Sequence, residues 1–127
     1  MHRAISPPSI APPAANYAHA VLSEAPTRLL HTSGVVPVGP DGAVPEDIAA
    51  QAAVVWANID AILDAAAMRP SDIVSVTTYA VVGSDLAPVM AARDRYLGSH
   101  RAASTLVTVP ALAQPAWLVE VAVVATS

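Results

Sequence analysis

The chain has 127 residues, enough for a single domain spanning 1–127; 54% of them are hydrophobic, 13% are charged, and the formal net charge at pH 7 is −4. It contains no cysteine and no lysine, which excludes disulfides, thiolate nucleophiles and Schiff bases on a lysine side chain. Its six basic residues are arginines scattered along the chain, so no basic surface for nucleic acid is expected.

The N-terminal part of the chain is predicted to hold two strands. Residues 1–15 are rich in proline and alanine and are expected to lie extended over the surface, outside any regular element. The predicted strands cover residues 17–23 and 28–34, with a turn at 24–27 between them. The chain then stays extended until Gly39-Pro40-Asp41-Gly42, which is a strong turn signal.

The segment after this turn has the clearest pattern in the sequence. Pro45-Glu46-Asp47 is typical of the first turn of a helix, because proline fits there and carboxylates suit the positive end of the helix dipole. Apolar residues then recur every three or four positions and predict one buried face: Ile48, Ala52, Val55, Ile59, Ile62, Leu63 and Ala66. Polar residues predict the solvent side: Gln51, Asn58, Asp60 and Asp64. Pro70 ends the helix at 68–69.

The second half of the chain alternates strand and helix. A β-branched run predicts a long strand over residues 72–82. Ser84-Asp85 caps a second helix that runs to Leu97, with Gly98 at its end. Two final strands are expected, over residues 104–109 and 118–125. Both helices look amphipathic and should pack on one face of a mixed sheet, which defines an α+β fold.

The high apolar content bears on assembly and location. A small monomer has too much surface to be this apolar, so burial between subunits is expected. Proline, aspartate, arginine or histidine interrupts every apolar run before the roughly 18 residues of a membrane span. Prolines at positions 7, 8, 12 and 13 break any secretory signal. A cytoplasmic protein without a membrane partner is therefore expected.

Residues 29–37, LLHTSGVVP, preceded by residues 16–21, NYAHAV, resemble the Rid family of reactive-intermediate deaminases, also called the YjgF family. The resemblance covers nearly the whole chain, including the order of its elements. It implies the chorismate mutase-like Rid fold, a homotrimer with sheets inside and helices outside, and cofactor-free pockets between subunits. Rid proteins convert enamines and imines to carbonyl compounds and ammonia, which requires holding a planar imine, polarising it and positioning a water.

The resemblance also assigns pocket residues. It places the pocket tyrosine at Tyr17, the Ser-Gly element at Ser33 and Gly34, and a position that the family fills with Cys, Ser or Thr at Thr105. Four further pocket positions hold apolar residues in place of the usual Gln, Asn, Arg and Glu, respectively: Val35, Met90, Ala103 and Ala122. The change to alanine at 103 removes the arginine that binds a substrate carboxylate bidentately in the family.

Arg101 and Glu120 lie two residues before the missing arginine and glutamate, so each shares a strand face with the position whose role it would take over. If the last two strands form an antiparallel hairpin in which Ala103 opposes Ala122, then Glu120 opposes Thr105 and lies about 13 Å from Arg101. Glu120 with Thr105 is then the predicted catalytic pair. The alternatives are a glutamate at a sheet rim or subunit interface and a solvated arginine at a loop end.

The histidines leave two interpretations open. His31 shares a strand face with Ser33 and could act as a general base near neutral pH, and His19 lies just after Tyr17. A place at a subunit contact is the more common role for such residues. The four histidines lack the HxH or HExxH spacing of a metal site, so no metal or other cofactor is expected. Trp56 and Trp117 are interpreted as packing residues.

Three function hypotheses follow. The first is a Rid-like deaminase or hydrolase of a small, uncharged enamine or imine, rather than of 2-aminoacrylate, because Ala103 offers no charge to a carboxylate. The second is a non-catalytic trimer that binds a small hydrophobic metabolite or regulates, which the four apolar replacements favour. A ribonuclease is the weakest reading, since the chain is acidic and has no lysine.

Overall fold

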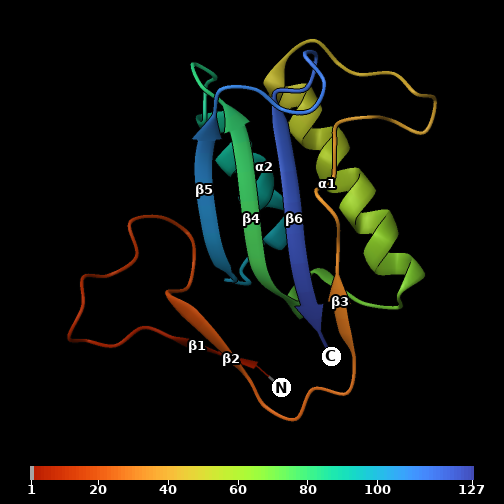
Figure 1. The fold of residues 1–127 in the computed structure, drawn as a ribbon. Helices are drawn as coiled ribbons and strands as arrows, with labels where there is room; N and C mark the ends of the chain where they lie inside the picture. The colour runs from red at the N-terminus through yellow and green to blue at the C-terminus, as the bar shows by residue number, and fades with distance from the viewer. Residues whose placement is uncertain (1) are drawn as a thin grey trace.

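Two helices cover one face of a four-stranded sheet, and a two-stranded ribbon of N-terminal chain lies at one end of it (Figure 1). The structure is a computed structural model that describes residues 2–127. Its elements, in chain order, are β1 (His2–Ile5), β2 (Ala20–Ser23), β3 (Leu29–His31), α1 (Ile48–Ala65), the 3-10 helix η1 (Pro70–Asp72), β4 (Ile73–Val81), α2 (Ala87–Leu97), β5 (Ala103–Val109) and β6 (Val119–Thr126). This arrangement confirms the predicted α+β class with two helices on one face of a mixed sheet.

The strand order of the sheet is β3-β6-β4-β5. β4 and β5 are parallel, and α2 connects them, because parallel neighbours need a crossover. β6 is antiparallel to both β3 and β4. Thr77 at the centre of β4 therefore stands opposite Thr105 on one side and Ala122 on the other.

The predicted hairpin between the last two strands is wrong. β4 lies between β5 and β6, so Ala103 does not oppose Ala122 and Glu120 does not oppose Thr105. Residues 110–118 instead carry the chain across β4 from one side to the other (Figure 1). An 11-residue helix, α2, lies between β4 and β5, and a strand–helix–strand unit of this kind favours parallel pairing of its two strands. β5 therefore pairs with β4 rather than with β6.

The N-terminal segment is more regular than predicted. Residues 2–5 form β1, which pairs antiparallel with β2 in the register His2 with Ser23 and Ile5 with Ala20. Backbone pairing holds this strand where proline and alanine content alone suggested an irregular segment. The predicted first strand is correspondingly shorter, Ala20–Ser23, while Ala18 makes a single bridge to Ala103 at the edge of the main sheet.

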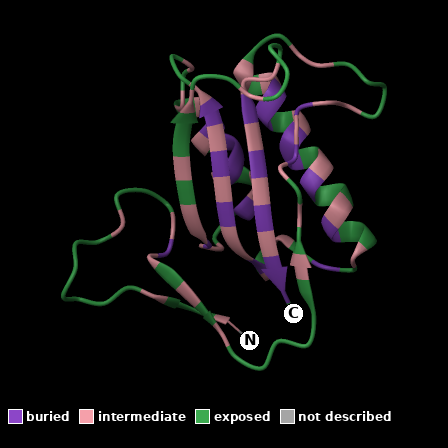
Figure 2. Cartoon of the chain, in the orientation of Figure 1, coloured by how far each residue is buried: buried purple, intermediate pink, exposed green. Residues whose placement is uncertain are grey.

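The core lies between the helices and one face of the sheet (Figure 2). β6 contributes alternate buried residues, Val119, Val121, Val123 and Ala125, so its other residues point to the helix-free face. α1 buries Val55, Ile59 and Leu63 as the periodicity predicted. Asp47 caps it by accepting a hydrogen bond from Ala50 N at 2.8 Å.

Gln51 corrects the prediction for the polar side of α1. It is fully buried, with 0% exposure, rather than on the solvent side. Its Nε2 donates to Pro45 O and Ala116 O, and its Oε1 accepts from Leu118 N, each at 2.8 Å. A buried amide is stable when its donors and acceptor are satisfied in this way, and here it fastens the start of α1 to the loop before β6.

Length and composition alone would let α1 cross a membrane: it has 18 residues with a mean hydropathy of 1.3. Its apolar side chains, however, are the ones that pack against β6 and into the core. The apolar character of α1 is therefore explained by the interior of this fold, as in other amphipathic core helices.

Candidate functional site

Gly34 and Glu120 are in direct contact across the edge of the sheet. A Cβ at position 34 would lie 2.6 Å from Cδ and 3.0 Å from Cγ of Glu120, and closer still to Oε2. Glycine thus leaves the space that the carboxylate fills. Backbone pairing of Val35 with Val121, through hydrogen bonds of 2.7 and 3.1 Å, fixes the two segments side by side. Ser33, Gly34 and Glu120 together are called the Ser-Gly half-site.

The Glu120 carboxylate packs against Gly34 but forms no hydrogen bond or ion pair within the described residues. The side chain is only half-buried. Glu120 stands opposite Tyr79 on the helix-free face of the sheet. A carboxylate with both oxygens uncommitted can accept a proton or a hydrogen bond from water or a ligand.

A cavity of about 480 Å³ adjoins this half-site, between residues 31–38 and α1. His31, Ser33, Gly34, Val35 and Asn58 are among its lining residues. Asn58 does not face solvent as predicted, because its Nδ2 donates to Val38 O at 2.9 Å and to Val36 O at 3.3 Å. His31 lines the cavity, but it pairs with Val124 on β6, four residues or about 13 Å along the strand from Glu120.

A second group of predicted residues lies at the opposite edge of the sheet. Tyr17 and His19 contact each other edge to face, with ring centroids 6.2 Å apart. Ala18 N donates to Ala102 O at 2.9 Å, which places this pair beside β5 and therefore beside Ala103 and Thr105. We call Tyr17, His19, Ala103 and Thr105 the Tyr17 half-site.

One ring nitrogen of His19, Nδ1, is buried without a hydrogen-bond partner among residues 2–127. Buried polar atoms of this kind are rare in folded proteins and call for an explanation. Sequence reasoning placed His19 near Tyr17 but gave no signal that one of its ring nitrogens would be unsatisfied.

One chain does not bring the two half-sites together. β3 and β5 are the two edges of the sheet, three strand spacings or about 14 Å apart. Thr105 and Glu120, the predicted catalytic pair, are separated by β4 and by two residues along the strands, about 12 Å in all. The prediction that they lie side by side is wrong, for the same reason that the predicted hairpin is wrong.

The other predicted pocket positions are distributed as follows. Ala122 and Ala103 share the helix-free face, and each stands opposite a residue of β4, Thr77 and Ser75 respectively. Val35 is buried in the core, with 8% exposure. Met90 lies on α2, in the helical layer on the other side of the sheet.

Arg101 does not take the place of the missing arginine, because its guanidinium group bonds to its own loop. Its Nη1 donates to Gly98 O at 2.8 Å and to His100 O at 3.2 Å, within its own loop. The side chain lines a separate cavity shared with β1. Arg93, which sequence reasoning did not single out, is buried on α2 and pairs with Asp94 at 2.9 Å, so it is committed elsewhere.

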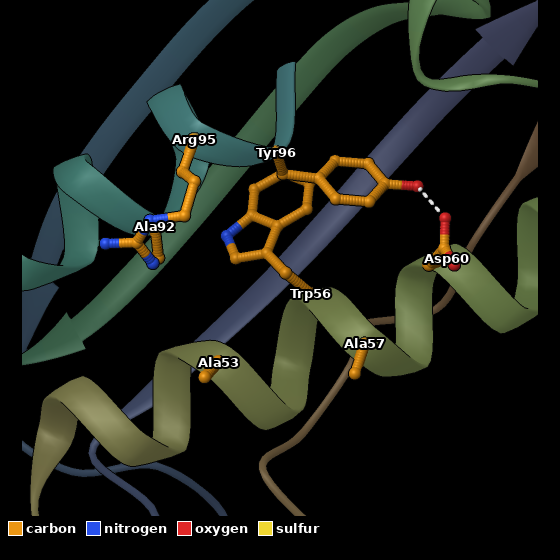
Figure 3. A pocket seen from close by; sticks show the side chains of 7 residues that line it. All are labelled: Ala53, Trp56, Ala57, Asp60, Ala92, Arg95 and Tyr96. Atoms are coloured by element: carbon orange, nitrogen blue, oxygen red, sulfur yellow. Dashed lines mark hydrogen bonds between the residues drawn. The ribbon is translucent and has the colours of Figure 1, made fainter. Parts of the chain in front are cut away.

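Between the helices lies another cavity, of about 410 Å³ (Figure 3). Trp56 stacks on Tyr96 there, with ring centroids 5.0 Å apart, and Tyr96 Oη donates to Asp60 Oδ1 at 2.7 Å. The pKa of Tyr96 is raised, first by burial and then by the carboxylates of Asp60 and Asp64. Trp56 is thus the packing residue predicted, while Asp60 is a hydrogen-bond partner rather than a purely solvated group.

The residues described, 2–127, contain no group of three or more histidine, aspartate or glutamate side chains that could hold a metal ion. The two half-sites themselves contain one carboxylate, two aliphatic hydroxyl groups, one tyrosine and one histidine.

Comparison with known proteins gives a consistent relationship. The chain matches the family model described as Endoribonuclease L-PSP over residues 9–127. It is 39% identical over 76 residues to 2-iminobutanoate/2-iminopropanoate deaminase of Escherichia coli (strain K12), which corresponds to 59% of this chain and 59% of that protein. The aligned part thus spans less than two thirds of these curated relatives.

Solved structures match over the whole chain. A protein of unknown function of the conserved Rid family, YyfB from Yersinia pestis, is 32% identical with a TM-score of 0.88, covering 99% of this chain and 98% of that one. Escherichia coli TdcF with bound serine is 25% identical with a TM-score of 0.73, covering 96% and 93%.

Proposed function

Since the chain belongs to the YjgF/Rid family that the Endoribonuclease L-PSP model describes, we propose that it hydrolyses a small, uncharged enamine or imine to a carbonyl compound and ammonia. The observation that carries this proposal is the Glu120 carboxylate lying against Gly34, beside Ser33, with both oxygens uncommitted within the described residues. Relatives with deaminase names support the reaction class.

In the proposed reaction, Glu120 accepts a proton from water as the water oxygen bonds to the imine carbon. Glu120 delivers this proton to the nitrogen, which gives a carbinolamine. It then takes the proton of the carbinolamine hydroxyl group and passes it to the nitrogen, the carbon–oxygen double bond forms as the carbon–nitrogen bond breaks, and ammonia leaves. One imine and one water thus give one carbonyl compound and one ammonia. Backbone groups around Ser33 and Gly34 offer hydrogen bonds to the reacting centre, and Thr105 supplies a hydroxyl.

The preference for an uncharged substrate rests on the Tyr17 half-site. Ala103 stands where a carboxylate-binding arginine is usual in the family, and the described residues put no other arginine in either half-site. A charge-assisted bidentate contact is worth a few kcal/mol, so an imino acid would bind at least about 100-fold more weakly without it.

We propose further that the site is completed in a homotrimer, where the Ser-Gly half-site of one subunit meets the Tyr17 half-site of the next. The helix-free face of the sheet supports this assembly, because Leu29 and Val107 are 63% and 41% exposed there in a single chain. A cytoplasmic location is part of the same proposal.

The test is ammonia release from a panel of enzymatically generated imines, some with and some without a carboxylate. We expect turnover of the uncharged imines by the wild type and a loss of about 10²- to 10⁴-fold in Glu120→Gln. That variant should keep ligand affinity and thermal stability, because Gln has the same shape. Failure of the wild type on every imine, or full activity of Glu120→Gln, would contradict the proposal.

A metabolite-binding trimer without catalysis is the second candidate. The alanines at positions 103 and 122 favour it, because they leave the helix-free face without the arginine and glutamate that the resemblance implies there. In that case Glu120→Gln would bind the same ligand with unchanged affinity, and neither protein would release ammonia. An endoribonuclease is not proposed, since six scattered arginines and a net charge of −4 offer no RNA surface.

A further inference from the structure

A cavity of about 330 Å³ lies between β1 and the loop that joins α2 to β5, apart from both half-sites. Its polar lining consists of two arginines, two histidines and two serines from three separate segments, namely Arg3, Arg101, His2, His100, Ser71 and Ser99. No carboxylate lines it. A lining with two arginines and no carboxylate is unusual in a chain that has ten acidic side chains and only six arginines.

The two arginines of this cavity have no acidic partner. Arg93 with Asp94 is the one ion pair found within residues 2–127, so neither Arg3 nor Arg101 is neutralised there. Arg101 uses only Nη1, on two carbonyls of its own loop, which leaves Nη2 and Nε free to donate. The Arg3 side chain makes no hydrogen bond within the described residues.

Hydrogen bonds hold both histidine rings of the cavity in place, so this part of its lining is preorganised. His2 Nε2 donates to Ser71 O at 2.9 Å, and His100 Nε2 donates to Ile73 O at 2.6 Å, since a carbonyl can only accept. His2 Nδ1 accepts from the hydroxyl of Thr126 at 3.3 Å. These bonds hold both rings in one orientation, with centroids 6.2 Å apart.

We propose that this cavity binds the phosphate group of a small phosphate monoester. Two guanidinium groups and two serine hydroxyls supply donors for the three terminal oxygens of such a group, and two positive charges balance its two negative ones. A carboxylate, with one charge and two oxygens, would use only part of this set. The cavity volume is at the lower end of the range for small-molecule sites.

Such a ligand would also connect two parts of the fold. Arg3 belongs to β1, whereas Arg101 and Ser99 belong to the loop before β5. A phosphate held by both would fasten the N-terminal strand to the start of β5, two residues before Ala103. Binding should therefore slow amide exchange in residues 2–5, which pair only with β2.

The experiment is calorimetric titration of the full chain with inorganic phosphate, glycerol 3-phosphate and succinate at constant ionic strength, which removes simple screening effects. We expect saturable binding of both phosphates and little or none of succinate. Arg3→Gln and Arg101→Gln should each weaken binding about tenfold or more. The matched control is Arg95→Gln, which removes an exposed arginine from α2 outside this cavity.

If Arg101→Gln unfolds, the test stands on Arg3→Gln, because the exposed Arg3 side chain has no structural partner in the described chain. Hydrogen exchange with and without phosphate gives a second readout in the wild type. Absence of saturable phosphate binding, equal weakening by Arg95→Gln, or tighter binding of succinate than of phosphate would overturn the proposal. None of these outcomes depends on imine hydrolysis.

Discussion

The Glu120 carboxylate occupies the space that a side chain at position 34 would take. Gly34 does not supply unusual backbone freedom, since its φ lies outside the positive region in which Gly42, Gly83 and Gly98 are found. What glycine supplies is room. β3 and the residues that follow it run antiparallel to β6, the last strand of the main sheet. Two residues far apart in the sequence thus come together in one half-site.

Gly34→Ala should therefore displace the Glu120 carboxylate without straining the backbone. We expect imine hydrolysis to fall about 10- to 100-fold, because a small misplacement of a proton acceptor is costly. The free energy of unfolding should change by less than about 1 kcal/mol, since the clash is with the end of a flexible side chain. Ammonia release and chemical denaturation measure the two effects. The control is Gly34→Ala combined with Glu120→Gln, which should lose no more activity than Glu120→Gln alone.

Ala103→Arg should restore affinity for substrates that carry a carboxylate. An arginine there would point to the helix-free face, beside Thr105 on the same strand, and could bind a carboxylate bidentately. We expect kcat/KM for imino acids to rise about 100-fold relative to uncharged imines, measured by ammonia release. Ala103→Gln adds similar length without charge and should leave the ratio nearly unchanged. An equal gain in both variants would show that size, not charge, sets the preference.

Mixing two inactive variants tests whether the half-sites meet between subunits. Glu120→Gln damages the Ser-Gly half-site, and Tyr17→Ala damages the other. Coexpression in equal amounts should restore about a quarter of wild-type activity, because each intersubunit site then has one chance in four of two intact halves. Sites formed within a single chain would give no recovery. Sedimentation of the mixture checks that subunits assemble.

Tyr96 should resist ionisation at alkaline pH. Burial, then the hydrogen bond and charge of Asp60, raise its pKa well above the ordinary value near 10. The folded state thus keeps this proton where the unfolded state has released it. The stabilisation is complete below about pH 10 and is lost as the pH rises through the folded-state value. Ultraviolet absorbance titration of wild type against Tyr96→Phe isolates the group. Asp60→Asn should lower its pKa, more than Asp64→Asn does.

Replacement of the buried Gln51 by Met should destabilise the fold. The change keeps volume but leaves Leu118 N, Pro45 O and Ala116 O without their partner. We expect a loss of about 2–3 kcal/mol in the free energy of unfolding, measured by urea denaturation. Gln114→Met, at an exposed position, is the matched control and should change stability by less than about 0.5 kcal/mol.

Periodicity predicted the long elements well. The Asp47 cap and the apolar spacing of α1 are local features, and the β-branched run of β4 is equally local. Gln51 was misplaced because periodicity treats a polar residue as exposed, whereas three backbone groups near α1 satisfy this amide. The sequence pattern does not predict β1, because its partner strand β2 lies beyond a proline-rich loop.

The site was harder to predict than the fold. The resemblance to Rid proteins predicts Ser33, Gly34 and Tyr17 as site residues, but the distances among them depend on strand order. A hairpin between the last two strands was assumed, and the crossover through α2 indicates parallel pairing of β4 and β5 instead. The contact of Glu120 with Gly34 has no local signal at all, because it depends on where β6 enters the sheet.

The position of β6 between β3 and β4 has a consequence for biosynthesis. A nascent chain that has emerged only as far as β5 has a parallel pair, β4 and β5, with β3 unpaired and one edge of β4 open. Parallel pairing through a crossover is slow, and open edges invite association between chains. The sheet closes, and Glu120 reaches Gly34, only after residues 119–126 have left the ribosome.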